Sequence, residues 1–301
     1  MIPAPFEYHA PKTLSEATKL LAQLGGDGKI LAGGHSLVPL MKLRLAAPKH
    51  VIDIGRVGDL KYIRADNGKL QVGALTTHYE IESSELLKAE CPLLPETAGE
   101  IGDVQVRNKG TIGGNLAHAD PAADWPAAIL ALGAELQATS VRAERWIPAK
   151  EFFVDLLTTS LEPDEILTAI RVPSLPRAAA QEGQSAPRAG DAYLKVPQPA
   201  SGFAIVGVAV RVVLNEERKI VEDVGIGITG VGPKAYRAVA AEAVLRGKSP
   251  SAQRLAEAAA HAAEGVDANS DLYASAEYRA HLASVYARRA LELAVQRASG
   301  A

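Results

Sequence analysis

The chain is organised around the glycine-rich stretch G-T-I-G-G-N-L at residues 110–116, followed by H-A-D-P-A-A-D at residues 118–124. A second glycine pair lies far upstream, in A-G-G-H-S at residues 32–36. Glycine adopts positive φ angles and lets a ligand approach the backbone closely, and successive N–H groups in a turn form a concave anion site. Ser36 and Thr111 would each add a hydroxyl donor. We therefore expect two loops that close on one diphosphate-bearing cofactor.

Each of these features also has a plain structural interpretation. Most glycine turns bind nothing, and Asp124 could simply be the N-cap of a helix that starts at Trp125-Pro126. As a ligand contact, Asp124 would accept a hydrogen bond from a ribose hydroxyl or a ligand N–H. The sequence G-I-G-I-T-G at residues 225–230 matches the dinucleotide-binding pattern, but its glycines alternate with β-branched residues. We interpret that pattern as part of a strand.

The composition excludes several classes of protein. The 301 residues carry a formal net charge of −3 at pH 7, which disfavours a nucleic-acid partner because such partners select a basic face. No apolar run approaches the roughly 18 to 20 residues that span a bilayer, and the N-terminus shows no secretory signal. The single cysteine, Cys91, excludes a disulfide framework and any iron–sulfur cluster held by four cysteines of this chain. We expect a cytoplasmic protein and an inert Cys91 thiol.

The first two segments, residues 1–57 and 58–176, both alternate between helical and strand patterns. A capping box at Thr13–Glu16 opens the first helix, a second one at Thr77–Glu80 opens another, and Asn67-Gly68 is a strong hairpin signal. Ser36 is expected to cap the helix that follows it. The predicted helices cover residues 14–24, 37–43, 77–87, 92–99 and 125–132, and the predicted strands cover residues 29–31, 51–54, 61–64, 69–72, 135–139 and 165–172.

The third segment, residues 177–301, changes in character along its length. Residues 177–190 are rich in Ala, Gln, Gly, Ser and Pro and predict a loop or linker. Two β-branched runs at residues 203–214 and 220–228 predict an antiparallel meander. Three alanine-rich stretches then predict helices at residues 237–246, 251–265 and 276–297. Strands followed by a layer of helices indicate an α+β arrangement.

The glycine stretches, extended to A-G-G-H-S-L-V-P-L-M-K at residues 32–42 and D-P-A-A-D at residues 120–124, closely resemble the FAD-binding medium subunit of molybdenum hydroxylases. Aerobic carbon monoxide dehydrogenase and xanthine dehydrogenase belong to this family. The resemblance covers essentially the whole chain. It implies an α+β protein with a two-subdomain FAD-binding fold, followed by a C-terminal antiparallel sheet packed with helices.

The resemblance also implies which residues hold FAD. The two glycine stretches would hold the diphosphate, and Asp124 would contact the ribityl or adenosine side. Ile101 and Leu167 would line the flavin pocket. Tyr193 and Lys195 would belong to a loop that approaches the isoalloxazine ring. The implied cofactor-binding set is Lys29, Ile30, Leu31, Ala32, Gly33, Gly34, His35, Ser36, Leu37, Ile101, Thr111, Ile112, Gly113, Gly114, Asn115, Asp124, Leu167, Tyr193 and Lys195.

The resemblance implies that substrate oxidation takes place on another chain. A large partner subunit would carry the molybdenum–pterin centre, and a small partner subunit would carry two [2Fe-2S] clusters, in a dimer of heterotrimers. Electrons would pass through those clusters to FAD on this chain and then to an external acceptor. This chain would then need no catalytic residue and no metal ligand of its own. Partner subunits could hold it at the inner face of the membrane.

Two other functions remain open from the residues alone. A stand-alone FAD-dependent oxidase or dehydrogenase would need an acid–base or substrate-gripping set near the flavin, and the sequence offers none that we can identify. A non-catalytic nucleotide-binding module would use the same glycine stretches without electron transfer.

Overall fold

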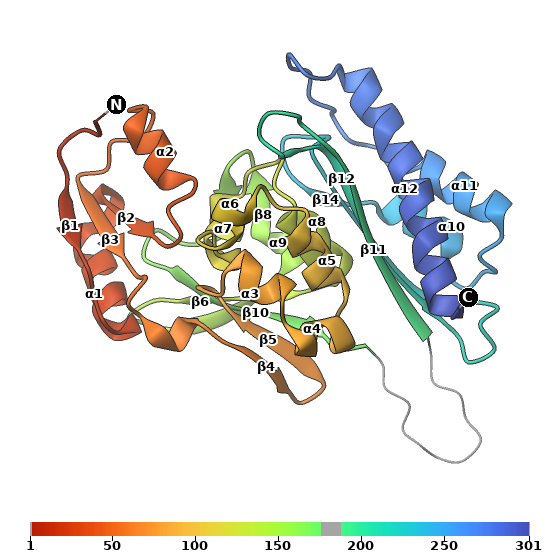
Figure 1. Ribbon diagram of the computed structural model, residues 1–301, viewed down its shortest axis with the longest axis horizontal. Helices are drawn as coiled ribbons and strands as arrows, with labels where there is room; N and C mark the ends of the chain where they lie inside the picture. Colours follow the sequence, from red (N-terminus) through yellow and green to blue (C-terminus); the bar gives the residue numbers. More distant parts are fainter. Residues whose placement is uncertain (1, 176–187, 301) are drawn as a thin grey trace.

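In the computed structural model, residues 2–175 and 188–300 are described, and they form three α+β units in a row (Figure 1). The first unit has a parallel sheet with strand order β1-β3-β2, built from β1 (Glu7–His9), β2 (Gly28–Leu31) and β3 (His50–Asp53). Helix α1 (Leu14–Leu24) packs on this sheet, and helix α2 (Leu37–Lys42) follows the first glycine pair. The 3₁₀ turn η1 (Gly25–Asp27) follows α1, and the 3₁₀ turn η2 (Gly58–Leu60) leads from the first unit into the second.

The ends of α1 agree with the sequence signals. Thr13 and Glu16 make both hydrogen bonds of the capping box, and Gly25 ends the helix at φ 53°. Ala17 and Leu21 of α1 pack against Ile52 of β3 in the core of this unit. The helical spacing of the apolar residues therefore predicted the buried face correctly.

The second unit is an antiparallel sheet with strand order β4-β5-β10-β6-β7. At the predicted hairpin, Asn67 and Gly68 have φ angles of 48° and 74°, as a type I′ turn requires. The strands are β4 (Ile63–Asp66), β5 (Lys69–Gly73), β6 (Glu135–Thr139), β7 (Glu144–Pro148) and β10 (Ile166–Pro173), with a small hairpin of β8 (Phe153–Asp155) and β9 (Thr158–Thr159). The helices are α3 (His78–Glu82), α4 (Glu85–Glu90), α5 (Leu93–Gly99), α6 (Val104–Arg107), α7 (Ile112–His118), α8 (Trp125–Ala131) and α9 (Ala149–Phe152).

The third unit is an antiparallel sheet with strand order β11-β12-β13-β14 and three helices. Helix α12 lies along one face of this sheet, and α8 of the second unit contacts β12 and β13 (Figure 1). The strands are β11 (Arg188–Pro197), β12 (Ala204–Leu214), β13 (Val221–Thr229) and β14 (Tyr236–Arg237), and the helices are α10 (Val239–Leu245), α11 (Ala252–Ala260) and α12 (Ala276–Ser299). The α+β fold class and the C-terminal meander are confirmed.

The G-x-G-x-x-G pattern does lie in a strand, as predicted, and its glycines serve packing. A Cβ atom on Gly225 would lie 1.9 Å from the Ala131 carbonyl oxygen, and one on Gly227 would lie 2.0 Å from the Ala127 carbonyl oxygen. Glycine is therefore needed where the backbone of α8 rests directly on β13.

Three predictions of secondary structure were wrong. The helix expected over residues 77–87 is two helices, because Ser84 accepts a hydrogen bond from Leu87 N at 3.3 Å and caps α4. The glycine stretch at residues 110–116 is mostly helix α7 rather than a loop. Of the loop expected at residues 177–190, residues 188–190 belong to β11, where they pair with β12, and residues 177–187 lie outside the described residues. None of the described helices is both long and apolar enough to cross a membrane.

Candidate functional site

The first glycine pair forms a turn between β2 and α2 that presents unused backbone donors. Gly34 has a φ angle of 75°, and the His35 ring donates from Nδ1 to the Gly33 carbonyl at 3.0 Å. Within the described residues, no group accepts a hydrogen bond from the N–H groups of residues 33 to 37. Such a run of free donors at a turn is suited to an anion.

Ser36 occupies the N-cap position of α2 but does not cap it. Its side chain makes no cap hydrogen bond, because its backbone is in the helical region, at φ −109° and ψ −55°, rather than extended. The expected hydroxyl cap is therefore wrong. The hydroxyl remains available at the edge of the same turn.

The second glycine stretch differs from the first because its donors are already used. Thr111 caps α7 by accepting from Gly114 N at 3.2 Å. The N–H groups of Ile112 and Gly113 donate to the carbonyls of Thr76 and Ala74 at 3.1 and 2.9 Å. These amides hold α7 to the second unit, so, unlike the first turn, this stretch offers no free N–H group from residues 112 to 114 among the described residues.

One side chain of α7 is left without a partner. The Asn115 side-chain oxygen is shielded from solvent and, among the described residues, has no hydrogen-bond partner. An unpaired buried acceptor costs free energy unless a ligand or water satisfies it. Asn115 is therefore a second feature of this region suited to a polar ligand.

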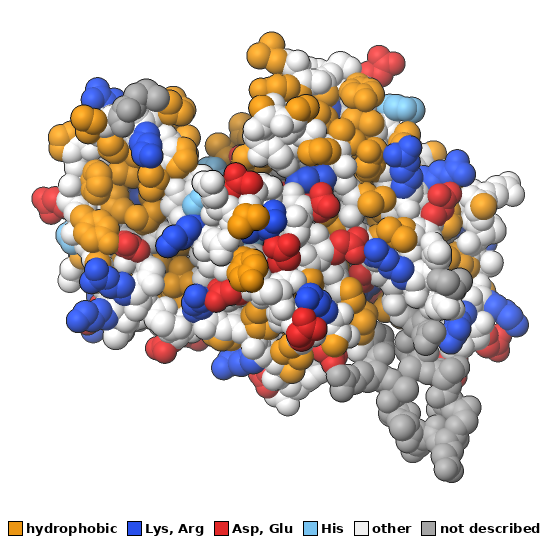
Figure 2. Space-filling model, in the orientation of Figure 1, with side chains coloured by type: hydrophobic (Ala, Val, Ile, Leu, Met, Phe, Trp, Pro, Cys, Tyr) orange, Lys and Arg blue, Asp and Glu red, His pale blue; other side chains and the backbone are white. Residues whose placement is uncertain are grey.

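The two glycine stretches meet, although a long stretch of sequence separates them. A Cβ atom on Gly33 would lie 2.2 Å from the Lys109 carbonyl oxygen and 2.8 Å from Gly110 Cα. A Cβ atom on Gly114 would lie 3.5 Å from Ala32 Cβ. Figure 2 shows a hollow open to solvent between the first unit and the rest of the molecule. Glycine is thus required where the two segments cross, and the first turn lies against the start of the α7 region.

Three of the predicted site residues gather in a buried cluster. The Tyr193 hydroxyl donates to Asp124 Oδ1, and Lys195 Nζ lies 3.0 Å from the same oxygen. Lys195 also donates to the carbonyls of Glu100 and Gly202. Tyr193 and Lys195 lie two residues apart on β11, so they share one face of a strand rather than belonging to a loop.

The electrostatics of this cluster follow from its burial. Asp124 is only 4% exposed, and burial raises the pKa of its carboxyl to about 6, while the Lys195 ammonium group and the Tyr193 hydroxyl act in the opposite direction. Burial and the neighbouring Asp124 charge raise the pKa of the Tyr193 hydroxyl well above its usual value. Asp124 stands at the N-cap position of α8 but makes no side-chain cap bond. Its side chain instead fixes Tyr193 and Lys195.

Ile101 and Leu167 both lie in the core of the second unit, at 6% and 5% exposure. Ile101 follows α5, and Leu167 lies on β10 at an irregularity in the pairing with β6. Residues 29–31 form β2 and lead directly into the first turn. These positions are compatible with a lining role.

His78, which no sequence motif marks as a site residue, packs against the glycine stretch at Gly110. Trp125 Nε1 donates to His78 Nδ1 at 3.1 Å, and a Cβ atom on Gly110 would lie 2.6 Å from His78 Nε2. Burial lowers the pKa of His78 to about 4, so the ring is neutral and can accept. The capping box marked the start of α3, but no local signal could reveal a contact with a residue 47 positions away.

A second buried polar cluster joins the second and third units. Arg211 Nε and Nη2 each lie 2.7 Å from an Asp191 carboxylate oxygen, and Leu93 N donates to Asp191 at 3.2 Å. Arg211 Nη2 also lies 3.2 Å from Cys91 Sγ. Burial raises the pKa of the Cys91 thiol to about 11, which agrees with an inert thiol.

Two family models and several known proteins match nearly the whole chain. The model of the FAD binding domain in molybdopterin dehydrogenase matches residues 4–175, and that of the CO dehydrogenase flavoprotein C-terminal domain matches residues 191–294. The chain is 39% identical over 294 residues to the carbon monoxide dehydrogenase medium chain of Hydrogenophaga pseudoflava, covering 98% of each chain. It is 38% identical to the medium chain of Afipia carboxidovorans, covering 99% of each.

Solved structures match the fold of nearly the whole chain. A structure of carbon monoxide dehydrogenase from Hydrogenophaga pseudoflava, which lacks the Mo-pyranopterin moiety of its cofactor, matches with a TM-score of 0.92 and 41% identity. That match covers 99% of this chain and 100% of the other. Quinoline 2-oxidoreductase from Pseudomonas putida 86 matches with a TM-score of 0.88 and 31% identity over 99% of both chains.

Proposed function

The chain belongs to the family of FAD-binding medium subunits of molybdenum hydroxylases, and we propose that it holds one FAD between the turn after β2 and the start of α7. It is an oxidoreductase subunit, the medium chain of a complex of the carbon monoxide dehydrogenase type with large and small subunits. Bound FAD would supply electron-relay chemistry between the [2Fe-2S] clusters of the small subunit and an external acceptor, with substrate oxidation at the molybdenum centre of the large subunit.

One observation carries the assignment of the diphosphate site to the first turn. The N–H groups of residues 33 to 37 lack acceptors within the described residues, and they lie where Gly33 crosses Lys109 and Gly110. A diphosphate would satisfy several of these donors at once, with the Ser36 hydroxyl as a further donor. We assign no diphosphate contact to the N–H groups of Ile112, Gly113 and Gly114, which already have acceptors.

The remaining predicted residues would position other parts of FAD. Asn115 would pair its free side-chain oxygen with a hydroxyl of the ribityl chain or the ribose. Asp124 is too buried to be the first group that a ligand meets, so we propose that it positions Tyr193 and Lys195. Ile101 and Leu167 would pack on the flavin ring and exclude water there.

We also propose the finer organisation that the sequence suggests. The domains would be residues 1–57, 58–176 and 177–301, and the complex would be a dimer of heterotrimers working in the cytoplasm, with attachment to the inner membrane face through its partners. Large exposed apolar side chains on the first unit support a partner surface: Ile2, Phe6, Tyr8, Leu43 and Leu45 are 41% to 79% exposed. Orange side chains cover much of this unit in Figure 2.

The proposal is tested by co-expressing this chain with the large and small subunits and purifying the complex. We expect one FAD per copy of this chain, iron and molybdenum in the partners, and flavin reduction only when the small subunit is present. A monomer of this chain that oxidises an organic substrate without partners would contradict the proposal. Absence of flavin from a folded, complete complex would contradict it as well.

Substitution of Gly114 tests the site itself. A Cβ atom there would lie 2.9 Å from Thr111 Oγ1, so the larger side chain of Gly114→Val should crowd the start of α7 and reduce FAD retention. Gly58→Val is the matched control, because a Cβ atom on Gly58 would meet no other atom within 4 Å and the φ angle of Gly58 is not positive. Equal flavin-to-protein absorbance ratios in the two variants would contradict the placement of FAD.

A further inference from the structure

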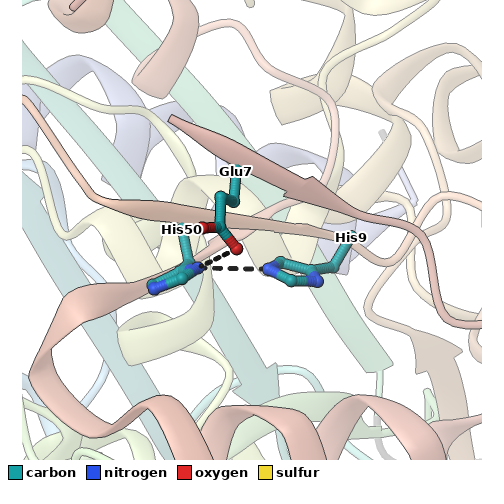
Figure 3. Close-up of side chains that lie close together, drawn as sticks. All are labelled: Glu7, His9 and His50. Atoms are coloured by element: carbon teal, nitrogen blue, oxygen red, sulfur yellow. Dashed lines mark hydrogen bonds and ion pairs between the residues drawn. The ribbon is translucent and has the colours of Figure 1, made fainter. Parts of the chain in front are cut away.

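Glu7, His9 and His50 bring three metal-ligating side chains together at the edge of the first sheet (Figure 3). Strands β1 and β3 pair in parallel, with Glu7 opposite His50 and His9 opposite Ile52. Side chains two residues apart in a strand share a face, so Glu7 and His9 project to the side on which His50 also projects. The register of two strands, rather than a flexible loop, therefore builds the cluster.

The distances in the cluster match those between ligands of one small ion. His9 Nε2 lies 3.2 Å from His50 Nδ1, and His50 Nδ1 lies 3.4 Å from Glu7 Oε2. All three ligand atoms lie within 4.8 Å of one another. A tetrahedral ion with bonds of about 2.0 to 2.1 Å has edges of about 3.3 Å between its ligands. Two of the three edges are thus already in place.

The third edge needs only a movement of Glu7. The Glu7 side chain is 74% exposed, while that of His50 is 20% exposed. A side chain with three rotatable bonds and few neighbours can swing to close the last edge at little cost. The partly buried histidines are the fixed part of the cluster, and the solvent side is open to an entering ion and to a water molecule.

We propose that Glu7, His9 and His50 bind one divalent transition-metal ion of the Zn²⁺ type, with water in a fourth position. Two imidazole nitrogens and one carboxylate form a donor set that suits Zn²⁺, whereas Mg²⁺ and Ca²⁺ prefer sites made of oxygen ligands. This site lies outside the candidate FAD site and does not rest on the proposed function. It revises the expectation that this chain carries no metal ligands.

The ion would join the N-terminal strand to the middle of the first unit. Strand β3 lies between β1 and β2, and β2 leads into the turn at residues 33–37. Because β1 is only three residues long, few backbone hydrogen bonds hold it. A metal bridge between β1 and β3 would therefore stabilise the strand most easily lost from the sheet.

The test uses the full chain without an affinity tag, stripped with a chelator and titrated with ZnSO₄ by calorimetry, with metal content measured after dialysis. We expect one equivalent of Zn²⁺, and affinity at least about tenfold lower in His9→Gln and in His50→Gln, because loss of a direct ligand should exceed the effect of losing an outer-shell partner. His261→Gln is the matched control, since His261 pairs with Glu264 but belongs to no group of three metal-ligating side chains among the described residues.

Each outcome decides the proposal. Binding of one equivalent that both ligand variants weaken and the control preserves supports it. The proposal is overturned if the wild type shows no stoichiometric Zn²⁺ binding or if the ligand variants bind Zn²⁺ as tightly as the wild type does. It is also overturned if the control loses as much Zn²⁺ affinity as the ligand variants do. Circular dichroism of each metal-free variant shows whether it is folded. If one histidine variant is misfolded, Glu7→Gln replaces it, because the exposed Glu7 side chain contributes little to the core.

Discussion

Gly33→Ala gives the sharpest test of how the two glycine stretches form one site. The new Cβ atom would lie 2.2 Å from the Lys109 carbonyl oxygen, whereas ordinary contacts begin at 3.4 Å. The turn and the segment before α7 would therefore have to separate by about 1 Å. Overpacking of this kind costs about 1 to 3 kcal/mol. If this free-energy cost is expressed entirely as weaker FAD binding, it corresponds to a loss of about 5- to 150-fold in FAD affinity.

The assay is a fluorescence titration of FAD onto the deflavinated chain, together with thermal unfolding of each variant. Gly26→Ala is the matched control, because its Cβ position has no neighbour within 4 Å and its φ angle is not positive. We expect the control to bind FAD as the wild type does, and Gly33→Ala to bind at least fivefold more weakly. A folded Gly33→Ala chain with FAD affinity within twofold of the wild type would refute the crossing of the two segments as part of the site.

Three further predictions concern charged groups. Hydrogen bonds from Arg171 and Lys69 hold the pKa of Glu135 down at about 2. Because this pKa is depressed, the ionised Glu135 carboxylate stabilises the folded state above about pH 4.5, and this stabilisation is lost as the pH falls toward 2. The stability difference between wild type and Glu135→Gln in urea unfolding should shrink across that range. Arg211→Met should lower the free energy of unfolding by about 3 to 5 kcal/mol, because it leaves the buried Asp191 carboxylate without its ion-pair partner. Lys195→Met should raise the pKa of Asp124 further, seen by NMR titration, and weaken FAD binding.

An exposed ion pair provides the control for Arg211→Met, and each of the three predictions has an outcome that would contradict it. The Arg288–Glu292 pair has side chains 54% and 44% exposed, so Arg288→Met should change stability by less than about 1 kcal/mol. Equal decreases in the free energy of unfolding for Arg211→Met and Arg288→Met would show that the buried cluster around Arg211 and Asp191 does not join the second and third units. A constant stability difference for Glu135→Gln from pH 5 to pH 2 would show that its ion pairs are not the cause of the shift. Unchanged FAD affinity in a folded Lys195→Met chain would remove Lys195 from the site.

Most of the fold could be predicted because its signals are local. The Thr13–Glu16 capping box, the Asn67-Gly68 turn and the β-branched run of β12 each depend on residues within a few positions of one another. The errors arose where local signals competed. Ser84 offered a second cap inside an apparently continuous helix. Thr111 caps a helix within the glycine-rich stretch. Glycine is needed there because a Cβ atom on Gly113 would lie 2.4 Å from Ala74 Cβ.

The sequence by itself determined the family, the α+β class and the cofactor, because motifs and patterns of neighbouring residues carry that information. Only the tertiary structure decided which groups near the glycine stretches are free. Among residues 2–175 and 188–300, it showed no acceptor for the N–H groups of residues 33 to 37, whereas the N–H groups of residues 112 to 114 have acceptors. It also brought Asp124 to Tyr193 across 69 positions and His9 to His50 across 41. Such contacts follow from strand register and the packing of helices on sheets, which no short stretch of sequence specifies.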